Sequence, residues 1–592
     1  MKKEILINFF RERTYEIEPL EVFEKKVARA AELGASQMFI EGIPKDHTYL
    51  ECYPGDPYPN WGMLLTNLFK IVVPEKLRGF LPVEYANKNL ELLKARGKIL
   101  EKYGMKAALI LVEPFYLPEA VYQAHPSWRG PRCDHPRRSK YMYFCPCMDN
   151  EEVREMYVEA MQELCKHVNI GYIRMYTNDS GSGLCWSSGL YNGPNGPAAC
   201  KDIGLPERIL GLFDSLEKGA AKAGREIMLE ITSNIGFKEN EHTMDAMWPL
   251  LKDNQIVNGK NNRGTQTVSH VVPELYDMVR PYRGLPLLVD FADQLESAYR
   301  SDSSIVDVHI LDGYEQEYCA YLELFLKKPA TGYVGRIALM SSLAESICGE
   351  QKAEKLLNAW IEIDEALHRL QALYMDNLIL LGPLHQRWIN RPLVPFPHEL
   401  NEDEKDYYRK YLFQATTETQ ANDPMNFQGM DFIKGFTATR ILKLCISKVV
   451  SLLCKATEEI QSLELEGTEL LTKRLSAFTC ILKTLMNIAV YQEVLDRTDY
   501  ESAPEYITRW PFNADERLLT LNRISRDEID NTYELISIFG DQIHEFFPMA
   551  QKSEDEDATV LGPDIILQMH KKIQTMFTHM RDADRLYESN NK

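Results

Sequence analysis

Short β-favouring runs alternate with amphipathic helical runs over roughly the first 340 residues, and this alternation constrains the fold more than any other feature. Residues 5–10 are expected to form a strand. Residues 19–33 follow as an expected helix, because apolar residues recur there at helical spacing and Gly34 comes directly after them. Helices between successive strands require those strands to be parallel.

The same alternation predicts seven or eight strand–helix repeats in this region. Further strands are expected at residues 37–41, 106–113, 171–175, 226–232, 255–258 and 287–291, with residues 306–311 and 333–339 as competing choices for the last. A doubly wound sheet and a closed (β/α)8 barrel both have this pattern. The count near eight, and the lack of a G-x-G-x-x-G turn after the first strand, favour the barrel.

After about residue 341 the pattern changes to helices without intervening strands. Helices are expected at residues 352–381, 437–457, 468–498 and 526–547. The sequence therefore predicts an α/β chain with a (β/α)8 TIM barrel in residues 1–345, followed by an all-α C-terminal domain in residues 346–592.

The composition narrows the classes of partner. A formal net charge of −20 argues against nucleic acid and anionic membrane surfaces as partners of the whole molecule. No run approaches the roughly 20 apolar residues that span a bilayer, and residues 1–8 lack the apolar core of a signal peptide. The 12 cysteines are scattered through apolar segments, which is typical of reduced thiols. We therefore expect a cytoplasmic protein, whose assembly into homo-oligomers the sequence leaves open.

Carboxylates stand at or near the ends of several expected strands, where a barrel builds its active site. They are Glu41, Glu113, Asp179, Glu230, Asp290 and Asp312. Converging carboxylates suit two chemistries: a protonated and an ionised group can share glycosidic bond cleavage, or several can bind a divalent cation through oxygen. Any one of them could also serve only as a helix N-cap or an ion-pair partner.

Aromatic residues in the expected loops indicate sugar as the ligand. Trp128 and Trp186 lie in long loops, and Trp248 lies in a short helix expected after the fifth strand. Flat aromatic faces pack against the apolar faces of pyranose rings, while polar neighbours bind the hydroxyls. The alternative is that loops of this length need small hydrophobic cores of their own.

The loop HPSWRGPRCDHPRRSKYMYFCPC, residues 125–147, carries two further candidate sites. His125 and Arg129 begin a local basic cluster that would suit a sugar carboxylate, although ion pairing with the protein's own acids is the simpler explanation for most of it. Zinc-ligating residue types also occur there in a spacing that fits no standard zinc finger: Cys133, His135, Cys145 and Cys147. We therefore expect neither a metal ion nor another cofactor.

Two segments carry a resemblance to known enzymes: YIRMYTND at residues 172–179 and GSGLCWSSGLYNGPNGP at residues 181–197. With the order of the elements, they resemble the catalytic barrels of glycoside hydrolase families 20, 84 and 67. These families are the β-hexosaminidases, the O-GlcNAcase-like enzymes and the α-glucuronidases. In the first two, the fourth strand ends in an adjacent acid pair, and in the third a nearby Gly/Pro-rich loop carries the acid.

Carried over by position, the resemblance implies that Asp179 is the general acid that protonates the departing oxygen. Asn178 takes the place of the acid that orients the substrate's acetamido group in hexosaminidases, and an amide supplies no negative charge to an oxazolinium ion. The chain is therefore expected to be a divergent relative. Glu230 and Asp290 are the candidate partners of Asp179. A carboxyl separation of about 5 Å would indicate retention, and one of about 6.5–9.5 Å inversion.

We therefore expect an exo-acting glycoside hydrolase that cleaves a terminal sugar from oligosaccharides by carboxylate acid/base catalysis. Its predicted catalytic residues are Asp179, Glu230 and Asp290. Its predicted substrate-binding residues are Asn178, Trp186, Trp128, Arg129, His125, Trp248 and Glu113. Two alternatives stay open. One is a catalytically inactive carbohydrate-binding relative, and the other is a divalent-metal sugar isomerase or lyase whose ligands are Glu230, Asp290 and His270 or His309.

Overall fold

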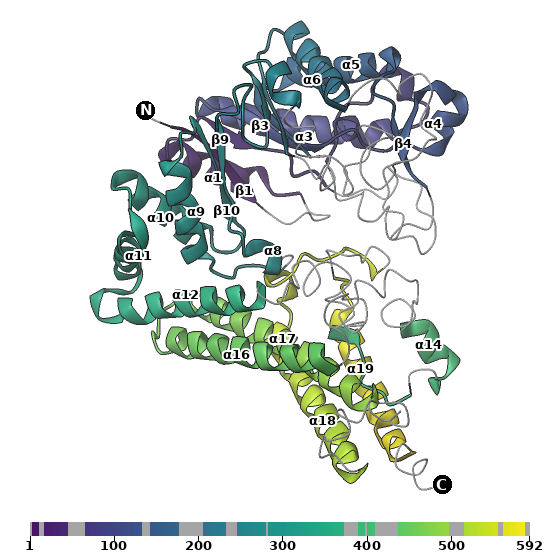
Figure 1. The fold of residues 1–592 in the computed structure, drawn as a ribbon, viewed down its shortest axis with the longest axis vertical. Helices are drawn as coiled ribbons and strands as arrows, with labels where there is room; N and C mark the ends of the chain where they lie inside the picture. The colour runs from purple at the N-terminus through teal and green to yellow at the C-terminus, as the bar shows by residue number, and fades with distance from the viewer. Residues whose placement is uncertain are drawn as a thin grey trace. The chain divides into compact units, whose positions relative to one another are not determined.

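A computed structural model describes most of the chain (Figure 1). The described residues are 3–10, 17–44, 66–132, 142–176, 205–232, 246–279, 282–371, 389–396, 399–408, 436–496, 514–553 and 561–585. The chain divides into two compact units. The first unit is Met1–Val272 with Phe291–Thr331, and the second is Pro273–Asp290 with Gly332–Lys592.

The first unit is built on one eight-stranded sheet in which all neighbouring strands are parallel. The strands are β1 (Glu4–Phe10), β2 (Gln37–Phe39), β3 (Lys106–Val112), β6 (Ile170–Tyr176), β7 (Met228–Thr232), β8 (Gln255–Val257), β9 (Val268–Val271) and β10 (Ile305–Leu311). Their order in the sheet is β8-β7-β6-β3-β2-β1-β10-β9. A separate antiparallel pair joins β4 (Arg129–Arg132) to β5 (Phe144–Pro146).

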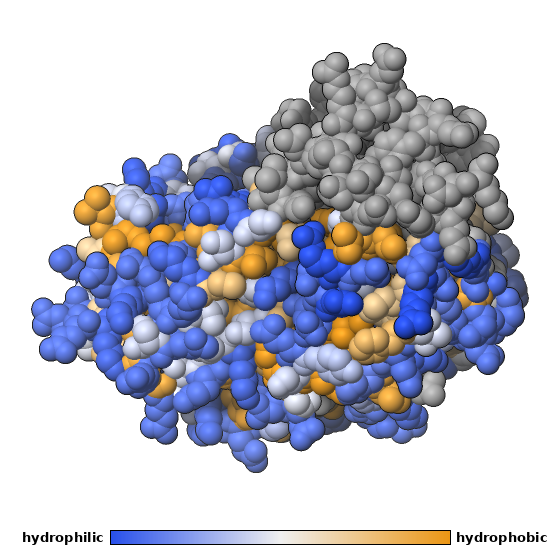
Figure 2. All heavy atoms as spheres, turned by 90° about the horizontal axis from the view of Figure 1, so that it is seen from below, coloured by the Kyte–Doolittle hydropathy of each residue, from blue (hydrophilic) through white to orange (hydrophobic). Residues whose placement is uncertain are grey.

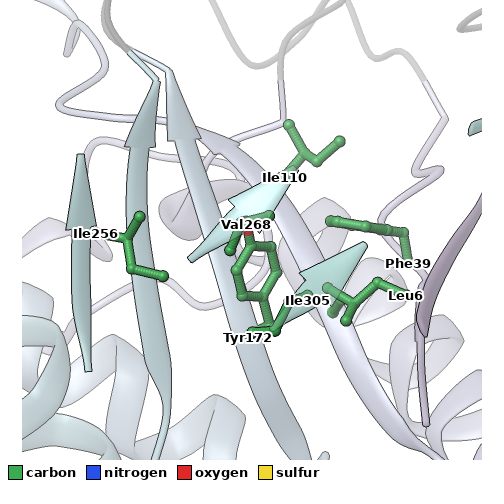
Figure 3. Close-up of a cluster of buried hydrophobic side chains, with 8 residues drawn as sticks. Leu6, Phe39, Ile110, Tyr172, Ile256, Val268 and Ile305 are labelled. Carbon is green, nitrogen blue, oxygen red and sulfur yellow. The ribbon is translucent and has the colours of Figure 1, made fainter. Parts of the chain in front are cut away.

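The large sheet curls, because side chains from both of its edge strands meet in one buried cluster (Figure 3). Ile256 of β8 and Val268 of β9 both belong to this cluster. Its other members are Leu6, Phe39, Ala108, Ile110, Tyr172 and Ile305. The amides of Thr267 and Val268 also donate to the Gly259 carbonyl oxygen over 2.7 and 3.0 Å, which links the two edges. The fold is a curled parallel sheet consistent with a TIM-like barrel.

The helix after β1 shows how the local sequence fixes these elements. α1 (Leu20–Glu32) buries one apolar face, which Phe23, Val27 and Ala30 form. It ends at Glu32 and is followed closely by Gly34, whose φ of 79° lies in the left-handed region that glycine adopts without strain. Both the helix and its end agree with the sequence prediction.

Helices also connect most of the other strands. In the first unit they are α3 (Val83–Lys102), α4 (Glu119–Ala124), α5 (Glu151–His167), α6 (Leu205–Lys222) and α10 (Glu315–Lys327). The strands expected at residues 5–10, 37–41, 106–113, 171–175, 226–232, 255–258 and 306–311 are confirmed, with bounds that differ by one or two residues. The alternation in the sequence therefore predicted most of the sheet correctly.

One expected strand, and one of the two competing choices for the last strand, are wrong. Residues 287–291 lead into α9 (Leu288–Arg300), and residues 333–339 lie within α11 (Gly332–Cys348). A short apolar run does not distinguish a buried strand from a buried helix, and each of these runs continues into a longer helical pattern. The sheet instead uses β9, a four-residue strand with the mixed sequence VSHV, which periodicity did not detect.

The described residues of the second unit are almost entirely helical. α12 (Glu350–Gln371), α16 (Phe436–Gln461), α17 (Glu469–Asp496) and α18 (Ala514–Phe539) pack in this order, each against the next (Figure 1). The unit also contains α8 (Tyr276–Val279), α11, α14 (Glu402–Tyr408) and α19 (Ile565–His579). The domain boundary predicted between residues 345 and 346 falls inside α11, and it stays a prediction.

The surface is mixed in character. On the face drawn in Figure 2, hydrophobic side chains lie in small groups among hydrophilic ones. Apolar side chains with high exposure include Val334, at 80%, and Leu519, at 68%. Among the helices in the described parts of the chain, none is long and apolar enough to cross a membrane.

Candidate active site

The inward-facing positions of the curled sheet change from apolar to polar toward the carboxyl ends of the strands. The apolar cluster includes Leu6, Tyr172, Val268 and Ile305. Because side chains alternate along a strand, the residues two positions further on also face inward. They are Asn8, Arg174, His270 and Asp307, with Glu230 in the same relation to Met228. We call these five residues, together with His309, the polar layer; it lies on the side where TIM barrels build their active sites.

Arg174 lies at the centre of the polar layer and is almost completely buried. Its guanidinium forms an ion pair with Asp307, and its Nε lies 3.4 Å from Glu230 Oε2. Its Nη1 lies 3.3 Å from His309 Nε2. The guanidinium carbon is 5.5 Å from the centre of the Phe39 ring. Burial alone would lower the pKa of Arg174, but the surrounding acidic groups raise it well above its usual value. A permanent cation is therefore fixed inside the sheet.

His270 is held between two carboxylates. Its Nε2 lies 2.9 Å from Glu230 Oε1, and its Nδ1 lies 3.0 Å from Asp307 Oδ2. Nδ1 is also 2.6 Å from Arg174 Nη2, from which it could accept a hydrogen bond only when it carries no proton. Burial and Arg174 lower the pKa of His270, but the two carboxylates raise it, and the net shift is above its usual value. With 24% of its side chain exposed, His270 is more accessible than Arg174, Glu230, Asp307 or His309.

Both oxygens of Glu230 are used within the protein. Oε1 accepts hydrogen bonds from His270 and, over 2.8 Å, from the Gly259 amide. Oε2 accepts from the Tyr172 hydroxyl and approaches Arg174. Burial alone would raise the pKa of Glu230, but His270, Arg174 and Tyr172 lower it to about 2. The carboxylate is therefore ionised and firmly oriented.

Asp307 is bound through one oxygen only. Its Oδ2 faces Arg174, His270 and His309, the last over 3.1 Å, whereas its buried Oδ1 has no hydrogen-bond partner among the described residues. Burial would raise the pKa of Asp307, but Arg174 and the two histidines hold it well below its usual range. Burial lowers the pKa of His309, so this ring is neutral near pH 7. On the neighbouring strand β1, the buried Nδ2 of Asn8 likewise finds no hydrogen-bond partner within the described part of the chain.

Three predicted site residues, Asn178, Asp179 and Trp186, lie outside the described residues. Their roles stay predictions. β6 ends at Tyr176, three residues before Asp179 in the sequence. β6 also carries Arg174, so the predicted acid follows the strand that supplies the centre of the polar layer.

Glu113 and Asp290 lie in other surroundings than the sequence suggested. Glu113 follows β3 but accepts hydrogen bonds from the Leu68 amide, over 2.6 Å, and from the hydroxyl of Tyr157 on α5, over 3.0 Å. Burial raises its pKa to about 7 despite these donors. Asp290 is in the first turn of α9 rather than at the end of a strand, and it accepts from the Leu275 amide over 2.9 Å. The helix dipole stabilises a carboxylate in the first turn of a helix.

Trp128 and His125 form part of a small packed core. Trp128 is 1% exposed, stacks on His125 with 3.7 Å between ring centres, and donates from Nε1 to Glu152 over 2.8 Å. Arg129 forms an ion pair with Glu119 over 2.5 Å and lies over the rings of Tyr122 and Phe144. This packing matches the alternative explanation for the aromatic loop, and sugar binding by these residues stays a prediction.

Trp248 lies in a 3-10 helix before β8, where the ammonium of Lys260 is 5.3 Å from its ring centre. Its buried Nε1 has no hydrogen-bond partner in the ranges that the structure describes, and a role of Trp248 in substrate binding stays a prediction.

The residues considered for metal binding are used in other contacts. Glu230 contacts His270, and Arg174 contacts both His270 and His309. Cys145 donates to the Pro114 carbonyl oxygen. Cys133 and His135 lie outside the described residues. Within the part of the chain that the structure describes, no group of three or more His, Cys, Asp or Glu residues is arranged to hold a metal ion.

Sequence reasoning missed Asn8, Arg174 and Asp307 as members of the site. The available signal was alternation within the strands. Arg174 is a charged residue inside the otherwise largely apolar run YIRMY, and Asp307 and His309 stand two positions apart in the otherwise apolar strand IVDVHIL. Such positions face inward once the sheet curls, so a buried polar residue there needs a partner or a ligand.

Comparisons with known proteins bear on the fold. No protein-family model matches the chain, and no curated protein matches it. Among solved structures, it is similar to a GH138 enzyme targeting pectin rhamnogalacturonan II, with 11% identity and a TM-score of 0.51. That match covers 100% of this chain and 68% of the other. At this identity the similarity concerns the fold alone.

Two weaker matches are also to glycoside hydrolases. The GH36 α-galactosidase AgaA from Geobacillus stearothermophilus has 15% identity and a TM-score of 0.33, over 55% of this chain and 42% of that one. The pneumococcal virulence factor StrH has 10% identity and a TM-score of 0.30, over 62% of this chain and 97% of that one. Both scores are too low to support an argument. The fold is thus similar to that of a glycoside hydrolase, and a specific relation to families 20, 84 or 67 stays a prediction.

Proposed function

We propose that the chain is an exo-acting glycoside hydrolase that cleaves a terminal sugar from oligosaccharides. The observation that carries the proposal is the polar layer, in which two carboxylates, an arginine and two histidines lie inside the carboxyl half of a curled parallel sheet. The similarity of the fold to that of a GH138 enzyme supports it. In this fold class, residues at the carboxyl ends of different strands combine into one site.

The division of roles follows from ionisation. Asp179 is the proposed general acid, because it comes three residues after the end of β6 in the sequence and the resemblance assigns that role to its position. The partner carboxylate must be ionised to act as a base or nucleophile or to stabilise an oxocarbenium ion. Glu230 meets this condition with a pKa of about 2. Asp307 meets it as well and keeps one oxygen without a partner.

The substrate class is a terminal sugar of an oligosaccharide. The similar GH138 enzyme is described as targeting pectin rhamnogalacturonan II, so we propose oligosaccharides of that polysaccharide as the first substrates to test. Dinitrophenyl and methyl glycosides of the common plant monosaccharides complete the panel. They differ in how much the departing oxygen needs a proton, which makes them a direct probe of a general acid.

The deciding experiment compares Asp179→Asn with the wild type on this panel. We expect kcat/KM for oligosaccharides and methyl glycosides to fall about 100-fold or more, with a much smaller loss on dinitrophenyl glycosides, whose leaving group needs no proton. Asp253→Asn, at an exposed aspartate of the first unit, is the matched control and should retain wild-type activity. An Asp179→Asn variant with unchanged activity on every substrate would overturn the assignment. A wild-type chain that cleaves no member of the panel would count against the hydrolase itself.

A further inference from the structure

We propose that Asn8 and Asp307 form the floor of the terminal-sugar subsite and together bind one hydroxyl group of that sugar. The inference deepens the proposed hydrolase function and rests on it for the identity of the ligand. The pair was not among the residues that the sequence indicated. It emerges from two buried polar atoms that the protein itself leaves unsatisfied.

The two atoms are the Nδ2 of Asn8 and the Oδ1 of Asp307. Asn8 is 5% exposed and Asp307 is fully buried, yet no residue that the structure describes offers either atom a hydrogen bond. Native proteins satisfy most of their buried polar groups, and a buried donor or acceptor without a partner is costly. A donor and an acceptor left unsatisfied on neighbouring strands therefore suggest a ligand that completes both.

The strand register places both residues on the same inner face. In the pairing of β1 with β10, Leu6 lies opposite Asp307 and Asn8 lies opposite His309. Leu6 belongs to the apolar cluster inside the sheet, so Asn8, two positions further on, faces inward as well. Asn8 and Asp307 are thus diagonal neighbours, a relation that keeps side chains within reach of one small group.

The surrounding contacts prevent Asp307 from satisfying Oδ1 by rotation. Its Oδ2 is already fixed by Arg174, by His270 over 3.0 Å and by His309 over 3.1 Å. Turning the carboxylate would break these charge-assisted bonds, which are the strong ones in a protein interior. Oδ1 is therefore a preorganised acceptor.

The chemistry of the pair selects a hydroxyl. A hydroxyl both accepts and donates, so it can take the hydrogen bond of Asn8 Nδ2 and give one to Asp307 Oδ1. A sugar carboxylate at this point would face an ionised Asp307, whose pKa is held well below its usual range. A ligand cation would face the positive charge of Arg174, which already pairs with Glu230 and Asp307. A neutral polar group is the remaining choice.

The test uses Asn8→Leu, which removes the unsatisfied donor and nearly keeps the volume. We measure binding of free galactose, galacturonic acid, rhamnose, glucose and N-acetylglucosamine by calorimetry, and thermal unfolding without sugar. Affinity for the best-bound sugar should fall about three- to tenfold, the value of one lost hydrogen bond. The unfolding temperature should stay equal or rise, because an orphaned donor has been removed. This combination separates a ligand-binding role from a structural one.

Asn390→Ala is the matched control, because Asn390 is a fully buried asparagine of the second unit whose Nδ2 donates to Gln568 over 2.6 Å. It should lower the unfolding temperature and leave sugar affinity unchanged. A drop in stability with unchanged affinity in Asn8→Leu would overturn the subsite, as would a wild-type chain that binds none of the five sugars. The outcome is separable from the proposed function. Sugar binding that depends on Asn8 in a chain without hydrolase activity would sustain the subsite alone, and activity with an unchanged KM in Asn8→Leu would sustain the hydrolase alone.

Discussion

Replacing Glu230 by glutamine tests the charge balance of the polar layer. The change removes one negative charge and nearly keeps the shape of the side chain. In the wild type, Glu230 accepts hydrogen bonds from the Gly259 amide over 2.8 Å, from His270 over 2.9 Å and from Tyr172. Glutamine has one acceptor oxygen and one NH2 group, so it cannot serve all of these donors. Arg174 and His270 also lose the negative charge of a neighbouring carboxylate.

The size of the effect follows from the pKa of Glu230. Its folded-state value of about 2 lies below the ordinary value of 4.5, so the ionised carboxylate contributes about 3 kcal/mol to the free energy of unfolding at pH 7. Because the folded pKa is the lower one, this contribution is complete above pH 4.5 and is lost as the pH falls toward 2. At pH 3.5 it has decreased to about 2 kcal/mol.

Urea unfolding of both proteins at pH 7 and pH 3.5 measures this difference. Hydrogen exchange of peptides from β6 and β7 assigns the transition to the first unit. Glu323→Gln is the matched control. The pKa of Glu323 is also lowered to about 2, through hydrogen bonds with Lys327 and Arg29, but its side chain is 40% exposed. Solvent screens such a pair, so the control should lose less than about 1 kcal/mol.

Two results would refute this reasoning. Equal losses in Glu230→Gln and Glu323→Gln at pH 7 would mean that burial does not strengthen the interactions of Glu230. A difference between Glu230→Gln and wild type that does not narrow at pH 3.5 would mean that the folded state does not hold Glu230 ionised. In either case the polar layer would not be the fixed set of charges on which the proposed function depends.

Two further predictions concern other buried charges. Burial raises the pKa of Glu113 to about 7, so the folded protein should lose stability as the pH rises from 5 to 8, and Glu113→Gln should remove this loss in thermal unfolding; an unchanged pH profile would contradict the assignment. In the second unit, Lys572 donates to Glu528 over 2.5 Å and to the Ile389 carbonyl over 3.0 Å, with both charged side chains almost inaccessible. Lys572→Met should cost about 3–5 kcal/mol in urea unfolding, and adding Glu528→Leu should recover much of it; a neutral single variant would show that the pair is not buried in solution.

The fold could largely be predicted from sequence where periodicity extends over a whole helix or strand. The strand at residues 106–113 and the helix at residues 19–33 have long, clear patterns, and both are confirmed. The failures are short segments. Residues 287–291 are an apolar run that is compatible with a strand or a helix, and only the packed structure decides. β9 has four residues, two of them polar, so its identity depends on pairing with β10 rather than on its own composition.

The candidate site was less predictable, because strand-end position is a weaker guide than the direction of the side chain. Glu113 and Glu230 were chosen by the same rule, yet Glu113 contacts Tyr157 of α5 whereas Glu230 contacts residues of three other strands or loops inside the sheet. The register decides which way each points, and it is set by distant segments. Asp307 lies in the middle of β10, so a rule that selects residues at strand ends does not select it.

The composition of the polar layer is better explained by ligand binding than by stability. The positions directly below it in the same strands are apolar, with Leu6 below Asn8, Val268 below His270 and Ile305 below Asp307. Buried ion pairs rarely stabilise a fold more than apolar residues of the same volume. Packing alone therefore does not explain why the inward-facing residues of the polar layer are charged rather than apolar. The change occurs on the carboxyl side of the sheet. Among the described residues it leaves two donors, Asn8 Nδ2 and Arg174 Nε, and one acceptor, Asp307 Oδ1, without a hydrogen-bond partner. Local violations of this kind are expected where a ligand completes the network, and Arg174 fixes the two carboxylates that such a ligand would meet.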